Sequence, residues 1–318
     1  MNPSIYLFAL LLVLPASWEA MHAQDKPLER TFAAGATSRY RVELLVRTEL
    51  AGQRPVRLGV KGYAEPFTRF VEARISWSAT ERTLSIGADG TAEMEETLDG
   101  FNLVASNAAT GDDPEWKKLA VTLEEALRGW AQARTVHYRA SRAGELRAIP
   151  KEAGPLLDEA VPLLLTPWLV RALRPVAALP AKPIRLAERW HEPRAVRLPG
   201  WDNAHGAESG EWLEAPESAE PAARLHVVQQ ITGAVTSGSE RLAAEAGGAI
   251  PLSVTGRFHG ESLASVSLMD GRLLRATRSA TREITWTLTP GEGFEQPLRF
   301  QGRLSVQVRI EECRDNCS

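Results

Sequence analysis

The chain has 318 residues, of which 44% are hydrophobic and 24% are charged, and its formal net charge is −3. This composition is typical of a globular protein that can bury an apolar core of its own. The slightly negative net charge provides no broad positive field, so we expect no nucleic-acid partner.

The beginning of the chain has the pattern of a secretory signal peptide. Residues 5–14 form an unbroken apolar run, which a proline and two small residues follow. This run is too short to cross a bilayer, which needs about 20 residues, but it matches the apolar part of a signal peptide. We therefore expect residues 1–23 to be removed, with cleavage after Ala20 or Ala23. The mature protein would be periplasmic or extracellular, without a transmembrane segment.

After this segment, polar residues give way to an alternating pattern. We expect residues 24–38 to be a loosely held lead-in. In residues 39–50, apolar side chains alternate with charged ones, and this period of two predicts a strand with one buried face. Ala51-Gly52 is then expected to form a turn, with residues 56–63 as the returning strand.

A second extended region is predicted for residues 67–86. Its alternation changes phase toward the end, which predicts a bulge or a break near Glu81. Asp89-Gly90 is a strong signal for a two-residue hairpin turn. Shorter strands are expected at residues 135–140 and 145–149.

Two helical segments are predicted in the middle of the chain. Asp113-Pro114-Glu115 combines an N-cap acceptor, a proline at the first helical position and an acid near the positive end of the helix dipole. Apolar residues then recur at helical spacing as far as Trp130. Residues 155–180 are apolar nearly all round, so we expect them to be buried, and their prolines would divide them into two short helices.

The second half of the chain is again predicted to be extended. We expect a loop at residues 200–210 and a second hairpin turn at Asp270-Gly271. The predicted strands of this half are residues 188–198, 211–215, 225–235, 252–268 and 274–288.

The most regular alternation is in residues 298–311. A strand of this length would be roughly 45 Å long and could bury one whole face only if the sheet curls. We therefore predict a mainly β (α+β) fold, in which a long curved antiparallel sheet, half-barrel-like, covers the two helical segments. Residues 24–318 would form a single β-rich domain. One interpretation of this domain divides it into two similar halves, 39–150 and 185–318, joined by the helical segment 155–180.

The two cysteines, Cys313 and Cys317, lie close together at the end of the sequence. In an exported protein an even pair favours a disulfide, which here would clip the end of the last strand. A metal site would need further ligands nearby, and a redox pair would normally have CxxC spacing at a helix start. We therefore interpret the pair as a structural disulfide.

No pattern that carries catalysis is present. His191-Glu192 does not begin a zinc-protease motif, because Ala195 stands where the second histidine is needed. A GxSxG motif and a phosphate-binding glycine loop are also missing. Asp112 and Asp113 could form an acid pair, although capping of the predicted helix explains them. We expect no catalytic residue, no metal site and no cofactor.

The tryptophans provide the candidate site. Trp116 and Trp130 belong to the first helical segment, Leu164 and Trp168 belong to the second, and Trp190 follows it. One interpretation is that these residues pack in the core, as large aromatic side chains commonly do. The other is that they line a cavity between sheet and helices that binds an apolar ligand.

Three short stretches resemble a pattern in exported bacterial proteins of unknown function. The stretches are Gly144-Glu145-Leu146, Leu179-Pro180-Ala181-Lys182-Pro183 and Glu188-Arg189-Trp190. Those proteins are similar to the lipoprotein-carrier and mycobacterial lipoprotein folds, in which a curved antiparallel sheet wraps helices around a hydrophobic cavity. Here Glu188-Arg189 replaces the usual Gly-Asp before the tryptophan, and no lipobox cysteine follows the apolar run. The resemblance implies lipid carriage.

We therefore predict an exported, non-catalytic protein that binds a hydrophobic ligand, such as a lipid, in a cavity between sheet and helices. The alternative is a cell-envelope protein–protein interaction module without a small ligand. Such a module would show an exposed strand edge or an apolar patch. An enzyme would instead need a polar cleft with acids of shifted pKa.

Overall fold

The computed structural model describes residues 23–58, 61–106, 117, 121, 125, 135–148, 172–177, 179, 183–185, 187–195, 201–214, 221–235, 251–288 and 297–313. All continuous elements in these ranges are β-strands. They are β1 (Ala23–Pro27), β2 (Thr37–Leu58), β3 (Lys61–Ile86), β4 (Ala92–Ser106), β5 (Thr135–Ala140), β6 (Leu146–Ala148), β7 (Pro183–Arg185), β8 (Arg189–Ala195), β9 (Trp201–Glu214), β10 (Ala222–Val235), β11 (Pro251–Ser267), β12 (Leu273–Leu288) and β13 (Leu298–Glu312). Within these ranges, no helix is long and apolar enough to cross a membrane.

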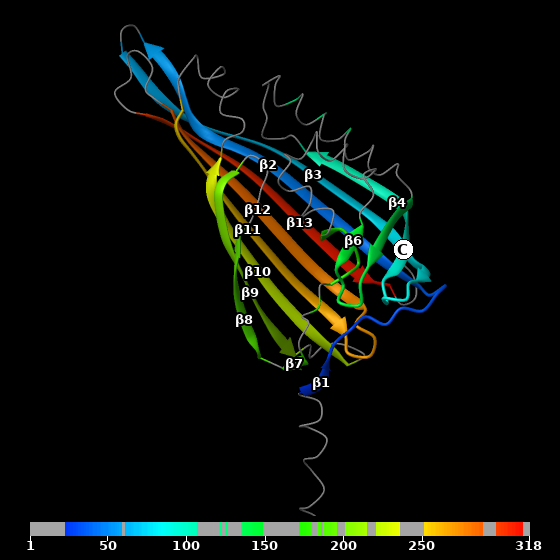
Figure 1. Cartoon of the computed structure of the whole chain (residues 1–318). Coiled ribbons are helices and arrows are strands. Elements are labelled where there is room, and N and C mark those ends of the chain that lie inside the picture. Colours follow the sequence, from blue (N-terminus) through cyan, green and yellow to red (C-terminus); the bar gives the residue numbers. More distant parts are fainter. Residues whose placement is uncertain are drawn as a thin grey trace, which may run out of the picture.

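Eleven of the strands form one antiparallel sheet, in the order β6-β5-β4-β3-β2-β13-β12-β11-β10-β9-β8. The remaining two, β1 and β7, form a separate two-stranded sheet. Within each arm of the large sheet, neighbouring strands also follow one another in the chain. The sheet therefore consists of two meanders that are joined where β2 pairs with β13. Figure 1 shows that the large sheet curves across its width, from β4 at one side to β8 at the other.

One face of this sheet is apolar across its width, and we call it the dry face; the opposite face is the outer face. Strand β13 shows why, because its buried and exposed residues alternate as its sequence does. Buried residues of β13 and side chains on the same face of the neighbouring strands form one core cluster. Members of this cluster on the central strands are Val42, Leu44, Val46, Ile75, Trp77, Leu304, Val306, Val308 and Ile310.

The prediction that the sheet covers two helical segments is wrong for the part of the chain that the structure describes. No continuous helix forms there, and the only residues with a helical backbone are Lys117, Val121, Glu125 and Ala172. Residues 172–177 instead form a turn and a bend, and they are buried against the core cluster. Pro175 explains part of this difference, because it lacks an amide donor and disfavours helix at the residue before it. Residues 107–116 and 151–171, where both helices were predicted to begin, lie outside the described ranges.

The first hairpin is longer than predicted. Strand β2 passes through Ala51-Gly52 without a turn and pairs with β3 as far as Leu58. A Cβ atom on Gly52 would lie 2.5 Å from Cδ1 of Phe300, so the glycine is needed where the ring of β13 crosses the β2 backbone. A glycine inside a strand can mark such a close approach as well as a turn.

The predicted loop at residues 200–210 is also wrong, because Gly206 and Gly210 lie inside a strand. Residues 201–210 belong to β9, which pairs with β10 over most of its length. A Cβ atom on Gly210 would lie only 2.1 Å from the ring of Trp190, and one on Gly206 would lie 2.9 Å from the side chain of Ile231. Gly210 therefore makes room for a ring of β8, and Gly206 makes room for the β10 backbone as well, because the same Cβ atom would lie 2.5 Å from the carbonyl oxygen of Gln230.

Several predictions are confirmed. The two Asp-Gly turns connect β3 to β4 and β11 to β12, and their glycines, Gly90 and Gly271, have φ angles of 75° and 67°. Strand β5 has the predicted bounds, and β13 ends one residue later than predicted. The predicted signal peptide lies outside the described residues up to position 22, and it remains a prediction. The division into two similar halves also remains a prediction.

Candidate functional site

A group of ionised side chains lies among the apolar residues of the dry face. Glu81 of β3 and Glu96 of β4 are 2% and 1% exposed. Arg30 forms an ion pair with Glu81, and Arg174 forms one with Glu96 at 2.5 Å. The hydroxyl of Tyr138 on β5 also donates a hydrogen bond to Glu81. Each buried carboxylate therefore has a cationic partner, as burial of a charge requires.

Burial shifts the pKa values in this network. It raises the pKa of Glu96, although the charge of Arg174 and its hydrogen bond act in the opposite direction. It also raises the pKa of Tyr138, and the charge of Glu81 adds to that shift. Burial alone would lower the pKa of Arg30, but Glu81 and the nearby tyrosines raise it above its ordinary value. Arg30 is therefore cationic and Tyr138 is a neutral donor.

Arg278 of β12 binds the backbone of the segment that crosses the dry face. Its Nη1 donates to the carbonyl oxygens of Ala172 at 2.5 Å and of Arg174 at 2.9 Å, and its Nη2 donates to that of Val176 at 2.6 Å. Arg278 is only 6% exposed, and burial lowers its pKa to about 10. One guanidinium thus binds the carbonyl groups of every second residue in this segment. The sequence predicts a helix for the same segment.

The irregularity predicted near Glu81 is confirmed a few residues further along, between Thr83 and Ser85, where the pairing with β4 shifts register. Residues 71–83 keep a single phase, with every odd-numbered side chain buried, and Glu81 therefore belongs to the dry face. The pairing with β4 also shifts register before Glu81, between Ser76 and Ser78. The expectation of a loosely held lead-in at residues 24–38 is wrong for Leu28 and Arg30, which are 5% and 7% exposed.

Sequence reasoning missed these charged residues, but their position in the alternation was a usable signal. Glu81 stands at the odd-numbered positions that the apolar residues of β3 occupy. Arg278 and Arg282 stand at the even-numbered positions that the apolar residues of β12 occupy. A charged residue on the apolar side of an alternating strand must find a partner or form a site. The alternation identified the face but not the partners.

Part of the dry face remains partly exposed. Half-buried apolar side chains pack against the core cluster from five neighbouring strands, β8 to β12. Large, partly exposed apolar surfaces of this kind typically mark sites for ligands or partners. We call this set the apolar strip, and its members are Trp190, Ala204, Val227, Ile231, Val254 and Ile284.

The structure places one of the predicted site residues in this strip. Trp190 is half-buried, and its ring lies over Gly210 of β9. The other predicted ligand-binding residues, Trp116, Trp130, Leu164 and Trp168, lie outside the described residues, and their role remains a prediction. Cys313 directly follows β13, but Cys317 lies outside the described residues, so the predicted disulfide also remains a prediction.

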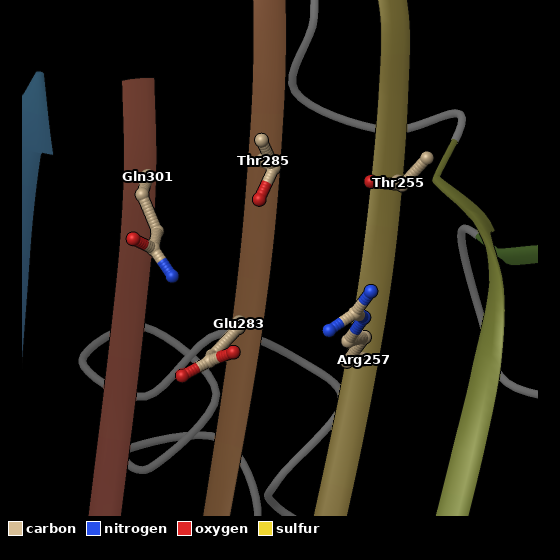
Figure 2. A pocket seen from close by; sticks show the side chains of 5 residues that line it. All are labelled: Thr255, Arg257, Glu283, Thr285 and Gln301. Carbon is tan, nitrogen blue, oxygen red and sulfur yellow. The ribbon is translucent and has the colours of Figure 1, made fainter. Parts of the chain in front are cut away.

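A separate hollow of about 230 Å³ lies on the outer face. Figure 2 shows its lining on three neighbouring strands: Thr255 and Arg257 from β11, Glu283 and Thr285 from β12, and Gln301 from β13. Polar side chains commonly neighbour one another across strands on an outer face. Glu283 also forms an ion pair with Arg303, with 3.6 Å between Oε1 and Nε. Within the described ranges, no group of side chains could hold a metal ion. Because every side chain that lines this hollow is polar or charged, the hollow does not suit an apolar ligand.

No protein-family model matches the chain, and no curated protein matches it either. Among solved structures, the chain is similar to one that describes lipid–protein interactions in lipovitellin, at a TM-score of 0.35 and 10% identity. That match covers 91% of this chain but only 26% of the lipovitellin chain. The chain is also similar to the β-barrel of the secretin domain of InvG from the Salmonella SPI-1 injectisome, at a TM-score of 0.16 and 11% identity, over 89% of this chain and 65% of that one. TM-scores this low support no conclusion about a shared fold or ligand, and the resemblance to lipoprotein carriers remains a prediction.

Proposed function

We propose that this protein is a non-catalytic binder of a hydrophobic ligand, such as a lipid, which lies on the dry face of the curved sheet. The observation that carries the proposal is the apolar strip, whose side chains remain partly exposed although they belong to the core side of the sheet. A ligand that covers them would remove apolar surface from water, which is favourable by about 25 cal/mol per Å². The apolar run at residues 5–14 supports the further proposal that the protein acts outside the cytoplasm.

The alternative, an interaction module, has less support from the strand edges. Edge strand β6 has three residues, and edge strand β8 has seven, including Pro193. A short strand offers few backbone groups to a partner, and a proline in an edge strand has no amide to donate. The described edges are therefore poorly suited to strand addition.

Ligand uptake by the full chain tests the proposal. Native mass spectrometry and lipid extraction of the purified protein would show whether an apolar molecule is bound on isolation. The protein stripped of lipid would then be titrated with a fluorescent fatty acid. We expect saturable uptake, and the proposal is wrong if no ligand co-purifies and the fatty acid does not bind.

A matched pair of variants locates the site. Ile231→Gln places a polar group in the apolar strip, whereas Leu263→Gln does so at a position on the outer face of β11 that is 37% exposed. Removing the burial of one aliphatic side chain should weaken binding by roughly tenfold. We expect this loss for Ile231→Gln only, at similar thermal unfolding temperatures. Equal effects of the two substitutions would show that the strip is not the binding surface.

A further inference from the structure

Arg282 is a charged side chain in an apolar position of the central strand β12. It is 8% exposed, and its neighbours in register are Phe258 of β11 and Leu304 of β13, which are 7% and 5% exposed. All three side chains belong to the dry face. The guanidinium group therefore lies among apolar residues and has lost most of its contact with water.

No residue that the structure describes gives Arg282 a hydrogen bond or an ion pair, and its Nε atom is buried without a partner. The arginine four positions earlier is different, because Arg278 donates to three carbonyl oxygens. Burial lowers the pKa of Arg282 to about 10, and no opposing charge offsets this effect. A guanidinium cannot avoid the cost by losing its proton at neutral pH, so its charge remains buried without a counter-charge.

The balance of charge on the buried side supports the same conclusion. The ionised side chains that are buried in the described ranges are four arginines and two glutamates: Arg30, Arg174, Arg278, Arg282, Glu81 and Glu96. Arg30 and Arg174 are paired with the glutamates, and Arg278 binds backbone carbonyls. Two positive charges are therefore in excess on this side, at Arg278 and Arg282, and carbonyl oxygens already accept the hydrogen bonds of Arg278. Arg282 is thus the place where an anion from outside the chain would complete the site.

Arg282 also borders the apolar strip. Ile284, two residues along the same strand, belongs to the strip, and Ile231 belongs to it one strand beyond Phe258. These strand spacings put both apolar side chains within about 10 Å of Arg282 along the sheet. The site thus combines a cation with an extended apolar surface, and a planar guanidinium matches the geometry of carboxylate and phosphate oxygens.

On the basis of the proposed function, we propose that Arg282 binds the anionic group of an amphiphilic ligand whose apolar tail lies on the strip. The shared chemistry is an oxyanion, either a carboxylate or a phosphate, attached to a long apolar chain. A fatty acid and an acidic phospholipid both have this chemistry. An uncharged lipid with the same tail would leave the guanidinium without a partner.

The test compares probes that differ only in the charged group. The stripped full-length protein is titrated with 11-(dansylamino)undecanoic acid and with its methyl ester, and inorganic phosphate is added as a competitor. Dioleoyl phosphatidate and diolein are compared in the same way, to distinguish a phosphate from a carboxylate head. We expect the protein to bind the acid at least tenfold more tightly than the ester, and we expect inorganic phosphate alone to compete weakly.

The variant Arg282→Gln should lose at least tenfold in affinity for the acid while its affinity for the ester changes less than twofold. The control Arg275→Gln, at an exposed position of the same strand, should change neither. Arg282→Met replaces the buried charge with an apolar chain of similar length, so it should fold at least as well as the parent and show the same loss. This second variant keeps the test valid if Arg282→Gln folds poorly.

Each result separates the two proposals. If the protein binds neither acid nor ester, the hydrophobic-ligand function itself is wrong. If it binds both probes equally, or if Arg282→Met keeps the preference for the acid, the role of Arg282 is wrong but the hydrophobic-ligand function stands. If inorganic phosphate competes as well as the acid does, the site binds a free anion and the amphiphile proposal fails.

Discussion

On the outer face, Arg139 and Glu93 form an ion pair at 2.6 Å with 58% and 46% of their side chains exposed, whereas on the dry face Arg174 and Glu96 pair at 2.5 Å with 2% and 1% exposed. The two pairs have the same chemistry and almost the same distance. They differ in their contact with water, which screens the outer pair and is excluded from the inner pair.

The pKa values of the two glutamates move in opposite directions. Hydrogen bonds from Arg139 and Ser85 lower the pKa of Glu93, whereas burial raises the pKa of Glu96 in spite of its arginine partner. For the outer glutamate, the partners decide the direction of the shift. For the inner glutamate, the loss of water decides it, so each partner on the dry face becomes essential to the other.

The largest effect is expected when the inner pair is broken. Glu96→Leu leaves Arg174 buried without its carboxylate, and the free energy of unfolding should fall by about 3–5 kcal/mol. The double variant Glu96→Leu, Arg174→Met should recover most of this loss, because it leaves no buried charge from the pair. Urea denaturation of both single variants and the double variant measures the coupling. Independent, additive losses would show that the two side chains do not depend on each other.

A smaller effect is expected when Arg278 is replaced. Arg278→Met leaves three carbonyl oxygens without their donor, at about 1 kcal/mol each, so the free energy of unfolding should fall by about 3 kcal/mol. Hydrogen exchange should accelerate in residues 172–177 before the strands are affected. Arg275→Met, on the outer face of the same strand, is the control and should change neither quantity. Unchanged exchange in residues 172–177 would mean that Arg278 does not hold this segment.

The smallest effect is expected for the outer pair, and it should depend on pH. The pKa of Glu93 is lowered on folding, so its contribution to stability is present above the unfolded-state value near 4.5 and is lost as the pH falls through the lowered folded-state value. Glu93→Gln should therefore shift the urea midpoint slightly at pH 7, less in high salt, and not at pH 2. A shift that persisted at pH 2 would have to come from packing and not from charge.

The alternation in the sequence predicts the strands well, because one strand needs only its own residues to define a dry side. Strand β13 was predicted for this reason, and both Asp-Gly turns were predicted because their signal likewise lies in adjacent residues. The glycines were harder to interpret, since Gly52 and Gly210 lie under rings of other strands and do not form turns. The sequence near each glycine does not contain the ring that covers it.

The buried charges could be located in the sequence but not explained from it. Arg278 has the parity of the apolar residues of β12, yet the carbonyl oxygens that it binds are more than 100 residues away in the chain. Arg30 and Glu81 are likewise 51 residues apart. Local patterns identify such residues as unusual, and only the fold shows which of them have partners and that Arg282 has none among the described residues.

The pairing of β2 with β13 has a consequence for how the protein is made. Residues 40–52 of β2 pair with residues 300–312 of β13. During synthesis, β2 therefore cannot complete its pairing until β13 has been made. A nascent chain on the ribosome could build each meander separately, but each would present an unpaired backbone edge until the other arrived. Closing so long a loop is slow, and we expect the unfinished polypeptide to rely on chaperones to keep these edges from joining other molecules.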